Sequence, residues 1–458
     1  MRRPARDPAR DPAPEPAPLA FFAACPRGLE AALADELASL GAQRCTPTPG
    51  GVGFDGDRQV AYAANLWSRL SSRILRRVAH GRYRRDDDLY RLAADVPWES
   101  WFDARHTLRV DLSAVRSPLR SLNFATLRIK DGIVDRLREL SGQRPSIDTR
   151  HPDARVFGYL RENEATLYLD LSGEPLFKRG WRSAREDKGE APLKENLAAG
   201  LLTLSGWTPE QPLYDPFCGS GTIVIEAAQI ACDIAPGLSR PFGLERLLDH
   251  DRELWAALRG EAIRRAQQAG AAARTAHANG APRLAASDID PTAIEQTRRN
   301  LARAGIAAEL VQLRRIDAGS IDAPFERPGF IVCNPPYGER IEAFGSDATR
   351  SIPAAGAPGA AGKAGAVAAD TADEHEQAMR AFGAALKRGF GGWRVHVLSS
   401  DPGLPRQLGM KERRRTPLFN GALECRLFGF EIFARDADGT ASAGALPTAI
   451  AAAPAPRS

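Results

Sequence analysis

QPLYDPFCGSGTIVIEAAQIA, residues 211–231, is the stretch that decides the fold of this chain. It predicts a short apolar strand at 212–214, a glycine turn at 218–221 and a helix that begins at Thr222. Strand, glycine turn and helix in this order form the first unit of a nucleotide-binding α/β domain. Because glycine has no Cβ, a ligand can lie against the turn, where the amide groups at the helix start face it.

The turn completes neither of the two common phosphate-binding patterns. No Lys-Ser or Lys-Thr follows it, so the sequence does not predict a P-loop, and the third glycine of the dinucleotide-binding spacing is missing. Taken alone, the two glycines are equally compatible with a plain structural turn.

A second motif lies downstream, FIVCNPPYG at residues 330–338. Here a strand of the buried type ends in Asn334, Pro335, Pro336 and Tyr337. The proline pair has no N–H donors and fixes the backbone, so neighbouring carbonyl groups are left pointing outward. An amide side chain, a fixed carbonyl and an aromatic ring suit a flat base with an exocyclic NH2 group, whereas the alternative is a loop stiffened by proline. In this order, each after a strand, the two motifs resemble those of class I S-adenosylmethionine-dependent methyltransferases that modify amino groups.

Composition sets the broad class of the protein. With 458 residues, 43% hydrophobic and 26% charged, the chain is long enough for two or three globular domains. Its six cysteines are scattered without a C-x-x-C pair, which favours a reduced, cytoplasmic protein without structural zinc or disulfides. No apolar run approaches the roughly 18 residues of a membrane span, and the N-terminal arginine pair precedes no apolar signal segment. We therefore expect no membrane partner and no metal.

The N-terminal part predicts small α+β modules. Residues 1–18 repeat Ala, Arg, Asp, Glu and Pro and are expected to be disordered. A strand at 19–22, a leucine-striped helix at 28–40, a strand at 52–54 and a helix at 60–78 then follow. Alternating runs at 106–112 and 166–171 enclose a further helix at 123–140.

A basic excess is concentrated in the same part of the chain. Residues 69–188 hold 25 Lys and Arg against 18 Asp and Glu, an excess of 7, while the whole chain carries a net charge of +5. Arg69, Arg73, Arg76 and Arg77 would form a basic stripe on the helix at 60–78, although a solvated helix face is the simpler alternative. A cluster of Lys178, Arg179 and Arg182 surrounds one tryptophan. We expect these seven cations to contact RNA.

Three further segments carry a closer resemblance: FFAACPRGLE near the start, AYAANLWSRL, and LSGEPLFKRGWR before the linker. They are similar to THUMP-domain RNA methyltransferases, and most similar to the bacterial subfamily that methylates guanine N2 in 23S rRNA. The resemblance covers roughly residues 19–435. Some bacterial relatives carry a second methyltransferase half, for which this chain is expected to end too early.

The resemblance implies an α/β fold, with a Rossmann-like class I methyltransferase domain behind an N-terminal α+β RNA-binding region. The expected domains are a disordered tail at 1–18, a ferredoxin-like module at 19–75, a THUMP domain at 76–182, the methyltransferase domain at 183–435 and a disordered tail at 436–458. Within the methyltransferase domain we expect a helical insertion at 242–280 and a flexible loop at 345–372 that is rich in Ala and Gly.

Cofactor-binding residues follow from the glycine turn, the acidic strand ends and the family pattern. Asp288 or Asp290 would accept hydrogen bonds from the ribose of S-adenosylmethionine; the family pattern favours Asp288, and Asp290 before Pro291 suits a helix cap. The family also places an APLKE helix against the cofactor, although Lys194 and Glu195 are equally compatible with a surface pair. The predicted set is Lys194, Glu195, Asp215, Pro216, Phe217, Gly219, Gly221, Thr222, Asp288 and Asp317.

Asn334, Pro335, Pro336 and Tyr337 are the predicted catalytic residues. The Asn334 oxygen and the Pro335 carbonyl would accept hydrogen bonds from the NH2 group, and Tyr337 would stack on the base, a contact worth roughly 1–3 kcal/mol. The expected substrate is 23S rRNA or a ribosomal assembly intermediate, methylated at guanine N2. Two alternatives stay open: a related enzyme that acts on tRNA guanine N2 or on adenine N6, and a non-catalytic RNA-binding factor of ribosome assembly.

Overall fold

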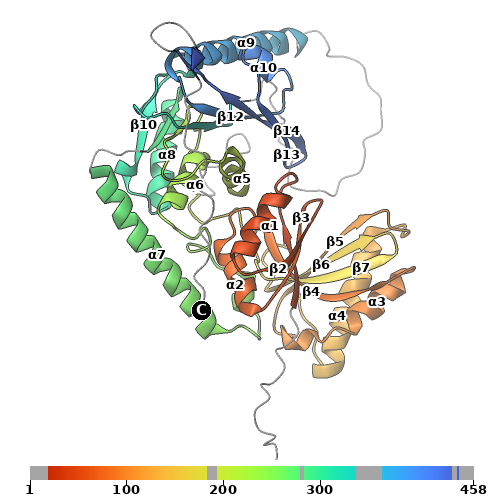
Figure 1. Cartoon of the computed structure of the whole chain (residues 1–458). Coiled ribbons are helices and arrows are strands. Elements are labelled where there is room, and N and C mark those ends of the chain that lie inside the picture. The colour runs from red at the N-terminus through yellow and green to blue at the C-terminus, as the bar shows by residue number, and fades with distance from the viewer. Residues whose placement is uncertain (1–18, 183–192, 279–282, 337–363, 436–440, 443–458) are drawn as a thin grey trace, which may run out of the picture.

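The computed structural model describes residues 19–182, 193–278, 283–336, 364–435 and 441–442, with the backbone alone at 364–373 and from 434 onward. The predicted tail at 1–18 lies outside these ranges, as does Tyr337. Two seven-stranded sheets, one in each half of the chain, form the centre of the molecule (Figure 1).

The first sheet has the strand order β2-β3-β1-β4-β7-β6-β5 and is antiparallel except for the β5–β6 pair. Its strands are β1 (Leu19–Ala24), β2 (Gln43–Thr48), β3 (Gly51–Gly56), β4 (Arg73–Arg82), β5 (Leu108–Val115), β6 (Ala154–Arg161) and β7 (Glu164–Asp170). The helices are α1 (Glu30–Ser39), α2 (Arg58–Trp67), α3 (Asp86–Ala94) and α4 (Leu122–Ser141), with a 3-10 turn η1 (Trp98–Ser100). Strand β4 lies in the middle and joins the ferredoxin-like part to the part formed by β5–β7.

The predicted helix at 60–78 is wrong beyond Trp67, where α2 ends and the chain turns into β4. The half-buried carboxylate of Glu36 stabilises this turn, because it accepts hydrogen bonds from the Ser68 hydroxyl at 2.6 Å and the Arg69 amide at 2.8 Å. Ile74 is then buried in the sheet core. Tertiary contacts thus override a helical spacing of leucines and arginines.

The second sheet has the strand order β10-β9-β8-β11-β12-β14-β13. Strands β8 (Leu213–Asp215), β9 (Leu284–Asp288), β10 (Val311–Arg315), β11 (Phe330–Cys333) and β12 (Arg394–Ser399) are parallel, and β13 (Arg414–Asn420) and β14 (Leu423–Glu431) form an antiparallel hairpin at one edge. From β8 the chain adds β9 and β10 on one side of the sheet and then β11 and β12 on the other, so the strand order reverses between the neighbours β8 and β11. In open α/β sheets ligands bind at such a switch point, outside the carboxyl ends of the strands.

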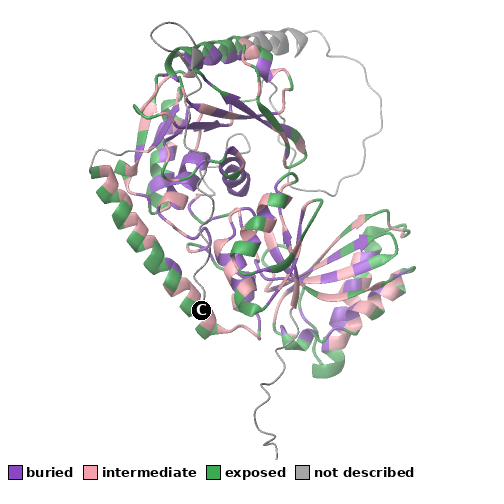
Figure 2. Cartoon of the chain, in the orientation of Figure 1, coloured by how far each residue is buried: buried purple, intermediate pink, exposed green. Residues whose placement is uncertain are grey.

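Helices cover both faces of this sheet and leave its central strands buried (Figure 2). They are α5 (Glu195–Ser205), α6 (Thr222–Ala231), α7 (Arg252–Ala278), α8 (Pro291–Arg303), α9 (Ala364–Gly389) and α10 (Leu404–Gln407), with 3-10 turns η2 (Gly243–Arg246), η3 (Ala308–Leu310) and η4 (Ala318–Ser320). Among the helices of the described ranges, none is long and apolar enough to cross a membrane.

Two predicted loop or tail segments contain regular structure. Helix α9 begins at Ala364, so the last residues of the predicted loop at 345–372 are helical, in keeping with the high helix propensity of alanine; the earlier ones lie outside the described residues. Within the predicted tail at 436–458, β16 (Ala441–Ser442) pairs with β15 (Ala434–Arg435). Inside the predicted insertion at 242–280 the structure has the long helix α7.

Candidate active site

A cavity of about 610 Å³ lies at the carboxyl ends of β8, β9 and β11 and beside η4, and we call it the strand-end cavity. Its volume falls within the range of small-molecule and cofactor sites. The lining residues are Leu193, Asp215, Pro216, Phe217, Cys218, Gly219, Ser220, Thr222, Ile223, Asp288, Ile289, Asp290, Thr292, Ala293, Gln296, Asp317, Ala318, Asn334, Pro336, His375, Ala378 and Met379.

The glycine turn between β8 and α6 forms one wall of this cavity. Gly219 has φ +51°, and a Cβ added to it would meet nothing within 4 Å, because the residue faces open space. Gly221 is the N-cap of α6 with φ +86°, and a Cβ there would come within 2.7 Å of Thr297 Cγ2. The two glycines therefore have different roles: Gly219 leaves room for a ligand, whereas Gly221 lets α6 begin close to α8.

Asp288, at the end of β9, holds the glycine turn in place. Its Oδ2 accepts a hydrogen bond from the Gly219 amide at 2.9 Å, and its Oδ1 accepts one from the Asp290 amide at 3.0 Å. Asp290 is the N-cap of α8 and accepts from the Thr292 amide at 2.8 Å, which confirms the predicted cap. Asp317 likewise caps η4 through the Gly319 amide at 2.7 Å.

Asp215 is the most deeply buried carboxyl group of the cavity wall, with 1% of its surface exposed. Its Oδ1 accepts a hydrogen bond from the Phe217 amide at 3.2 Å. Burial raises the pKa of this carboxyl group to about 8, and the negative charge of Asp288 acts in the same direction. A cationic ligand beside Asp215 would favour its ionised form.

Asn334 and Pro336, directly after β11, line the same cavity. Because β11 pairs in parallel with β8, with Ile331 opposite Tyr214, the residues that follow the two strands meet at one edge of the sheet. Pro335 is buried and does not line the cavity. The structure thus brings the two motifs of the sequence together, although Asn334 lies 115 positions after Gly219 in the chain.

Three predicted cofactor-binding residues do not line the cavity. Glu195 is 3% exposed and bound to Arg182, Lys194 lines a different cleft, and Gly221 faces Thr297. In the segment before α5, Leu193 lines the cavity, whereas the predicted Lys194 and Glu195 do not. The predicted residues that do line it are Asp215, Pro216, Phe217, Gly219, Thr222, Asp288 and Asp317.

Sequence reasoning missed the residues that α8 and α9 contribute. Thr292, Ala293 and Gln296 lie on one face of α8, and His375, Ala378 and Met379 lie on one face of α9. Spacings of three and four residues place side chains on a common helix face, so a periodic pattern was present in the sequence. Which face turns toward the strand ends is decided only by packing.

Arg182 supports the cavity from behind instead of contacting RNA, which corrects the prediction. Its guanidinium donates to Glu195 Oε1 at 2.5 Å, to Thr222 Oγ1 at 2.5 Å and to Ser220 Oγ at 3.1 Å. It also donates to the Leu193 carbonyl at 3.3 Å. Since Leu193, Ser220 and Thr222 all line the cavity, Arg182 is a positioning residue that joins the glycine turn to the start of α5.

Arg69 and Arg179 are also corrected, because both are held inside the molecule by Glu226 of α6. Glu226 is fully buried and Arg179 is 2% exposed. Arg69 lies 3.3 Å and Arg179 lies 3.1 Å from the Glu226 carboxylate, and Arg179 also donates to the Arg69 carbonyl at 2.6 Å. This triad, which we call the Glu226 cluster, joins the turn after α2 to the helix that follows the glycine turn.

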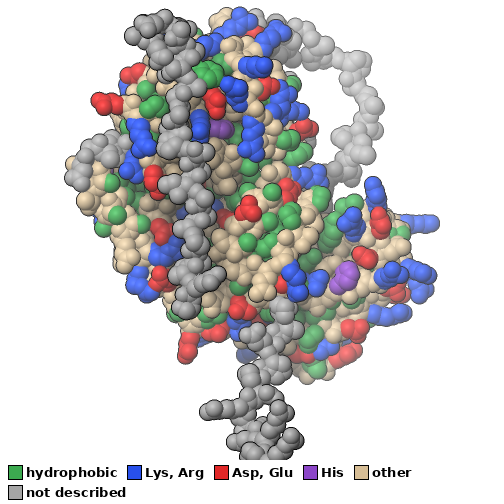
Figure 3. All heavy atoms as spheres, viewed as in Figure 1, with side chains coloured by type: hydrophobic (Ala, Val, Ile, Leu, Met, Phe, Trp, Pro, Cys, Tyr) green, Lys and Arg blue, Asp and Glu red, His purple; other side chains and the backbone are tan. Residues whose placement is uncertain are grey.

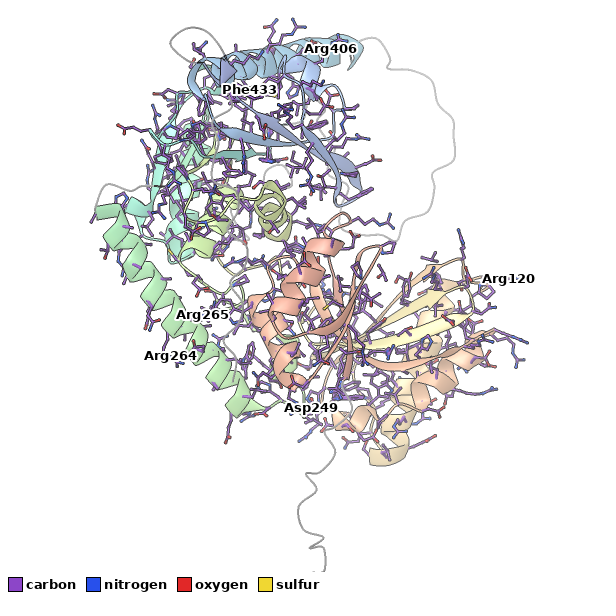
Figure 4. All side chains as sticks on the ribbon, in the orientation of Figure 1. Arg120, Asp249, Arg264, Arg265, Arg406 and Phe433 are labelled. Atoms are coloured by element: carbon purple, nitrogen blue, oxygen red, sulfur yellow. The ribbon has the colours of Figure 1, made fainter. Side chains whose placement is uncertain are left out.

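Arg73 and Arg76, on β4, are paired in the same manner. Arg73 binds the buried Asp170, and Arg76 lies 3.2 Å from Asp249, which precedes α7 and is close to the first sheet (Figure 4). A charge that is partly taken out of water is stabilised by pairing, so both arginines have a structural role, and their contact with RNA stays a prediction. Arg77 and Lys178 are exposed, so RNA contact stays a prediction for both. Lys178 also forms a surface ion pair with Glu174 at 2.6 Å.

The fold is that of a class I methyltransferase domain with a ferredoxin-like and a THUMP domain at its N-terminal side. Three family models match the chain: an RlmL ferredoxin-like domain at residues 20–75, a THUMP domain at 83–170 and an RMKL-like methyltransferase domain at 182–349.

In the part of the chain that the structure describes, no group of three or more His, Cys, Asp or Glu side chains has the geometry to hold a metal ion.

The particular relatives are ribosomal RNA large subunit methyltransferases K/L. The chain is 39% identical over 428 residues to the protein of Aeromonas salmonicida, covering 90% of this chain and 54% of the relative. It is 40% identical over 422 residues to that of Syntrophotalea carbinolica, with the same coverage of 90% and 54%. The chain therefore spans about half the length of the curated relatives it matches.

Solved structures resemble the whole described fold. The structure of a predicted N6-adenine-specific DNA methylase from Listeria monocytogenes is 29% identical, with a TM-score of 0.74, and the match covers 91% of this chain and 96% of that one. SMU.472, a putative methyltransferase complexed with SAH, is 26% identical, with a TM-score of 0.73, and the match covers 91% and 98%.

Proposed function

We propose that this chain transfers a methyl group from S-adenosylmethionine to the exocyclic amine N2 of a guanine in 23S rRNA. The observation that carries the proposal is the meeting of two motifs on one cavity. The glycine turn after β8 and Asn334 after β11 both line the strand-end cavity. A donor held by the first and a base held by the second would therefore lie next to each other.

The residues present fit S-adenosylmethionine. The open face of Gly219 offers backbone to the methionine end, Asp288 offers carboxylate oxygen to the ribose hydroxyls, and Asp317 offers it to the adenine amine. The related structure of SMU.472 is complexed with SAH, which is the demethylated product of this cofactor. When bound, the cofactor supplies an activated methyl group on a sulfonium.

The chain itself would supply orientation and hydrogen-bond acceptors. Asn334 Oδ1 accepts a hydrogen bond from the NH2 group, which directs the nitrogen lone pair toward the methyl group and stabilises the positive charge that develops on nitrogen. Holding donor and acceptor in line contributes several kcal/mol, roughly 7–11 kcal/mol in the best cases. No acid–base residue is required before the transfer, because the neutral amine forms the new N–C bond as the S–C bond breaks and SAH leaves, and the cationic nitrogen then loses a proton to water.

The RNA substrate is supported by the THUMP domain and by the names of the relatives. Guanine N2 and 23S rRNA follow from the family resemblance of the motifs, and the cytoplasm, where ribosomal RNA is modified in bacteria, is the proposed location. A second candidate, adenine N6, is favoured by one observation, the similarity to the Listeria structure, which carries the name of an adenine-specific DNA methylase.

The test separates these candidates by product. Unmodified 23S rRNA, tRNA and DNA are incubated with the protein and radiolabelled cofactor, then digested, and the nucleosides are separated. Label in N2-methylguanosine from 23S rRNA is the expected result. Label in N6-methyladenosine would move the assignment to adenine, and label only in tRNA would overturn the substrate. No label from a protein that binds the cofactor would favour the assembly-factor alternative.

A further inference from the structure

A second cavity, of about 450 Å³, lies between the ferredoxin-like domain and the β13–β14 hairpin. We call it the interdomain cleft. Five separate parts of the chain line it, and three of them carry the argument: the loop after β1 with Arg27, the start of α5 with Lys194, and the hairpin turn with Phe419 and Asn420. In Figure 1 the end of this hairpin points at the loops beside α1. The Phe419 amide donates to the Arg27 carbonyl at 3.2 Å, which fixes the two sides of the cleft to each other.

Two exposed cations, Arg27 and Lys194, line the cleft, and among the described residues no Asp or Glu lines it. Glu30 lies behind the lining, where its Oε1 accepts a hydrogen bond from the Gly50 amide at 2.9 Å. Each cation instead lies over an aromatic ring: Arg27 is 5.8 Å from the centre of Phe419 and Lys194 is 5.1 Å from that of Phe177. Such contacts hold the charged groups in place without neutralising them. Lys and Arg side chains also gather over β13–β14 (Figure 3).

The cleft adjoins the strand-end cavity through two consecutive residues. Leu193 lines the strand-end cavity and Lys194 lines the cleft. Consecutive Cα atoms are about 3.8 Å apart, so the linings of the two cavities are contiguous along the chain at this point. The cleft is small, so it admits one strand and not a duplex.

We propose that the interdomain cleft binds the phosphodiester backbone of a single RNA strand, next to the nucleotide whose base enters the strand-end cavity. That the polymer is RNA rests on the proposed function. Positive grooves that follow the backbone are the usual way in which proteins hold single strands. Phosphate contacts would come from Arg27 of the ferredoxin-like domain and Lys194 of the methyltransferase domain. They would favour an unpaired or locally opened target, because a base that stays paired would keep its flanking phosphates outside the cleft.

The experiment compares two double variants that remove the same charge. Arg27→Gln/Lys194→Gln removes the cleft cations, and Arg264→Gln/Arg406→Gln removes two exposed arginines that lie away from the hairpin end (Figure 4). Binding of a fluorescent single-stranded 23S rRNA fragment is measured by anisotropy over a range of salt concentrations. The logarithm of the binding constant falls with the logarithm of the salt concentration, and each lost phosphate contact reduces the steepness of this fall by about 0.7. The slope should therefore become less steep by about 1.4 in the cleft variant and stay almost unchanged in the control.

The outcomes separate this inference from the proposed function. Equal slopes for the cleft and control variants, with both proteins melting as the wild type does, would overturn the inference. The charge-keeping variant Arg27→Lys/Lys194→Arg should restore the slope, and failure to do so would also count against it. Cofactor affinity by calorimetry should be unchanged in all variants. The two proposals can also fail separately. If the wild type transfers no methyl group, the proposed function is refuted. If RNA binding by the cleft variant still depends less on salt than binding by the wild type does, the cleft remains an RNA site.

Discussion

The strand-end cavity and the Glu226 cluster contain the same kinds of carboxyl group in opposite settings. In the cluster, Glu226 is bound by two arginines and has no exposed surface. In the described part of the chain, Asp215, Asp288 and Asp317 have no Lys or Arg within ion-pair distance, and their hydrogen bonds come from backbone amides. A buried carboxylate that is already paired holds the fold together, whereas one that faces a cavity without a cation can still accept a ligand.

Breaking the Glu226 cluster should have the largest effect. Glu226→Ala leaves the buried Arg179 and the half-buried Arg69 without their carboxylate, and removing one partner of a buried pair costs about 3–5 kcal/mol. The measurement is urea unfolding, with Glu295→Ala as the control. Glu295 pairs with Arg298 on the exposed face of α8, where such pairs contribute about 0–1 kcal/mol. Equal losses in the two variants would show that the cluster is not structural.

The second-largest effect should come from removing the Asn334 side chain, the proposed hydrogen-bond acceptor of the amine. Asn334→Ala is expected to lower the rate of methyl transfer about 10²–10³-fold, as does the loss of one preorganised hydrogen-bond partner in other enzymes. Cofactor affinity should stay within about twofold, since the lost contact is to the base. Steady-state kinetics and calorimetry measure the two quantities, and Asn163→Ala, on the exposed β6–β7 turn, is the control. An unchanged rate would refute the role of Asn334.

A pair of neighbouring aspartates sharpens the comparison within the cavity. Asp288→Ala should weaken cofactor binding by about 1.5–3 kcal/mol, the value of a hydrogen bond to a charged group. Asp290→Ala should mainly destabilise α8, at a cost of about 1 kcal/mol, because Asp290 is its N-cap. Calorimetry and thermal melting distinguish the two effects. Similar losses of affinity in both variants would contradict the separate roles.

The smallest expected effect is a pH dependence of cofactor binding. Because the pKa of Asp215 is raised to about 8, its carboxyl group is mostly protonated at pH 6–7.5 in the free protein. A cationic cofactor favours the ionised form, so binding should release a proton and affinity should rise with pH, by at most about tenfold per unit. Calorimetry in buffers of different ionisation enthalpy measures this proton. Asp215→Asn should remove the dependence, and a wild-type affinity that is flat over this range would refute it.

Local signals were predicted well from the sequence. The turn at Gly219 and Gly221, the cap at Asp290 and the strand before Asn334 each depend on residues within one turn of chain, so the sequence shows them directly. The switch-point rule then explains why the two motifs meet. The face of α9 with Met379 was not predicted, because helical spacing does not say which face packs toward the strand ends.

By itself the sequence determined the glycine turn, the helix that follows it and the acidic strand ends, because backbone preference and short-range hydrogen bonds set them. Only the tertiary structure decided what the arginines do. Arg69 and Glu226 are 157 positions apart, and Arg73 and Asp170 are 97 apart, so no local pattern links the partners. An arginine that looks like an RNA contact in the sequence becomes a structural ion pair when folding takes it out of water, since the charge must then be paired.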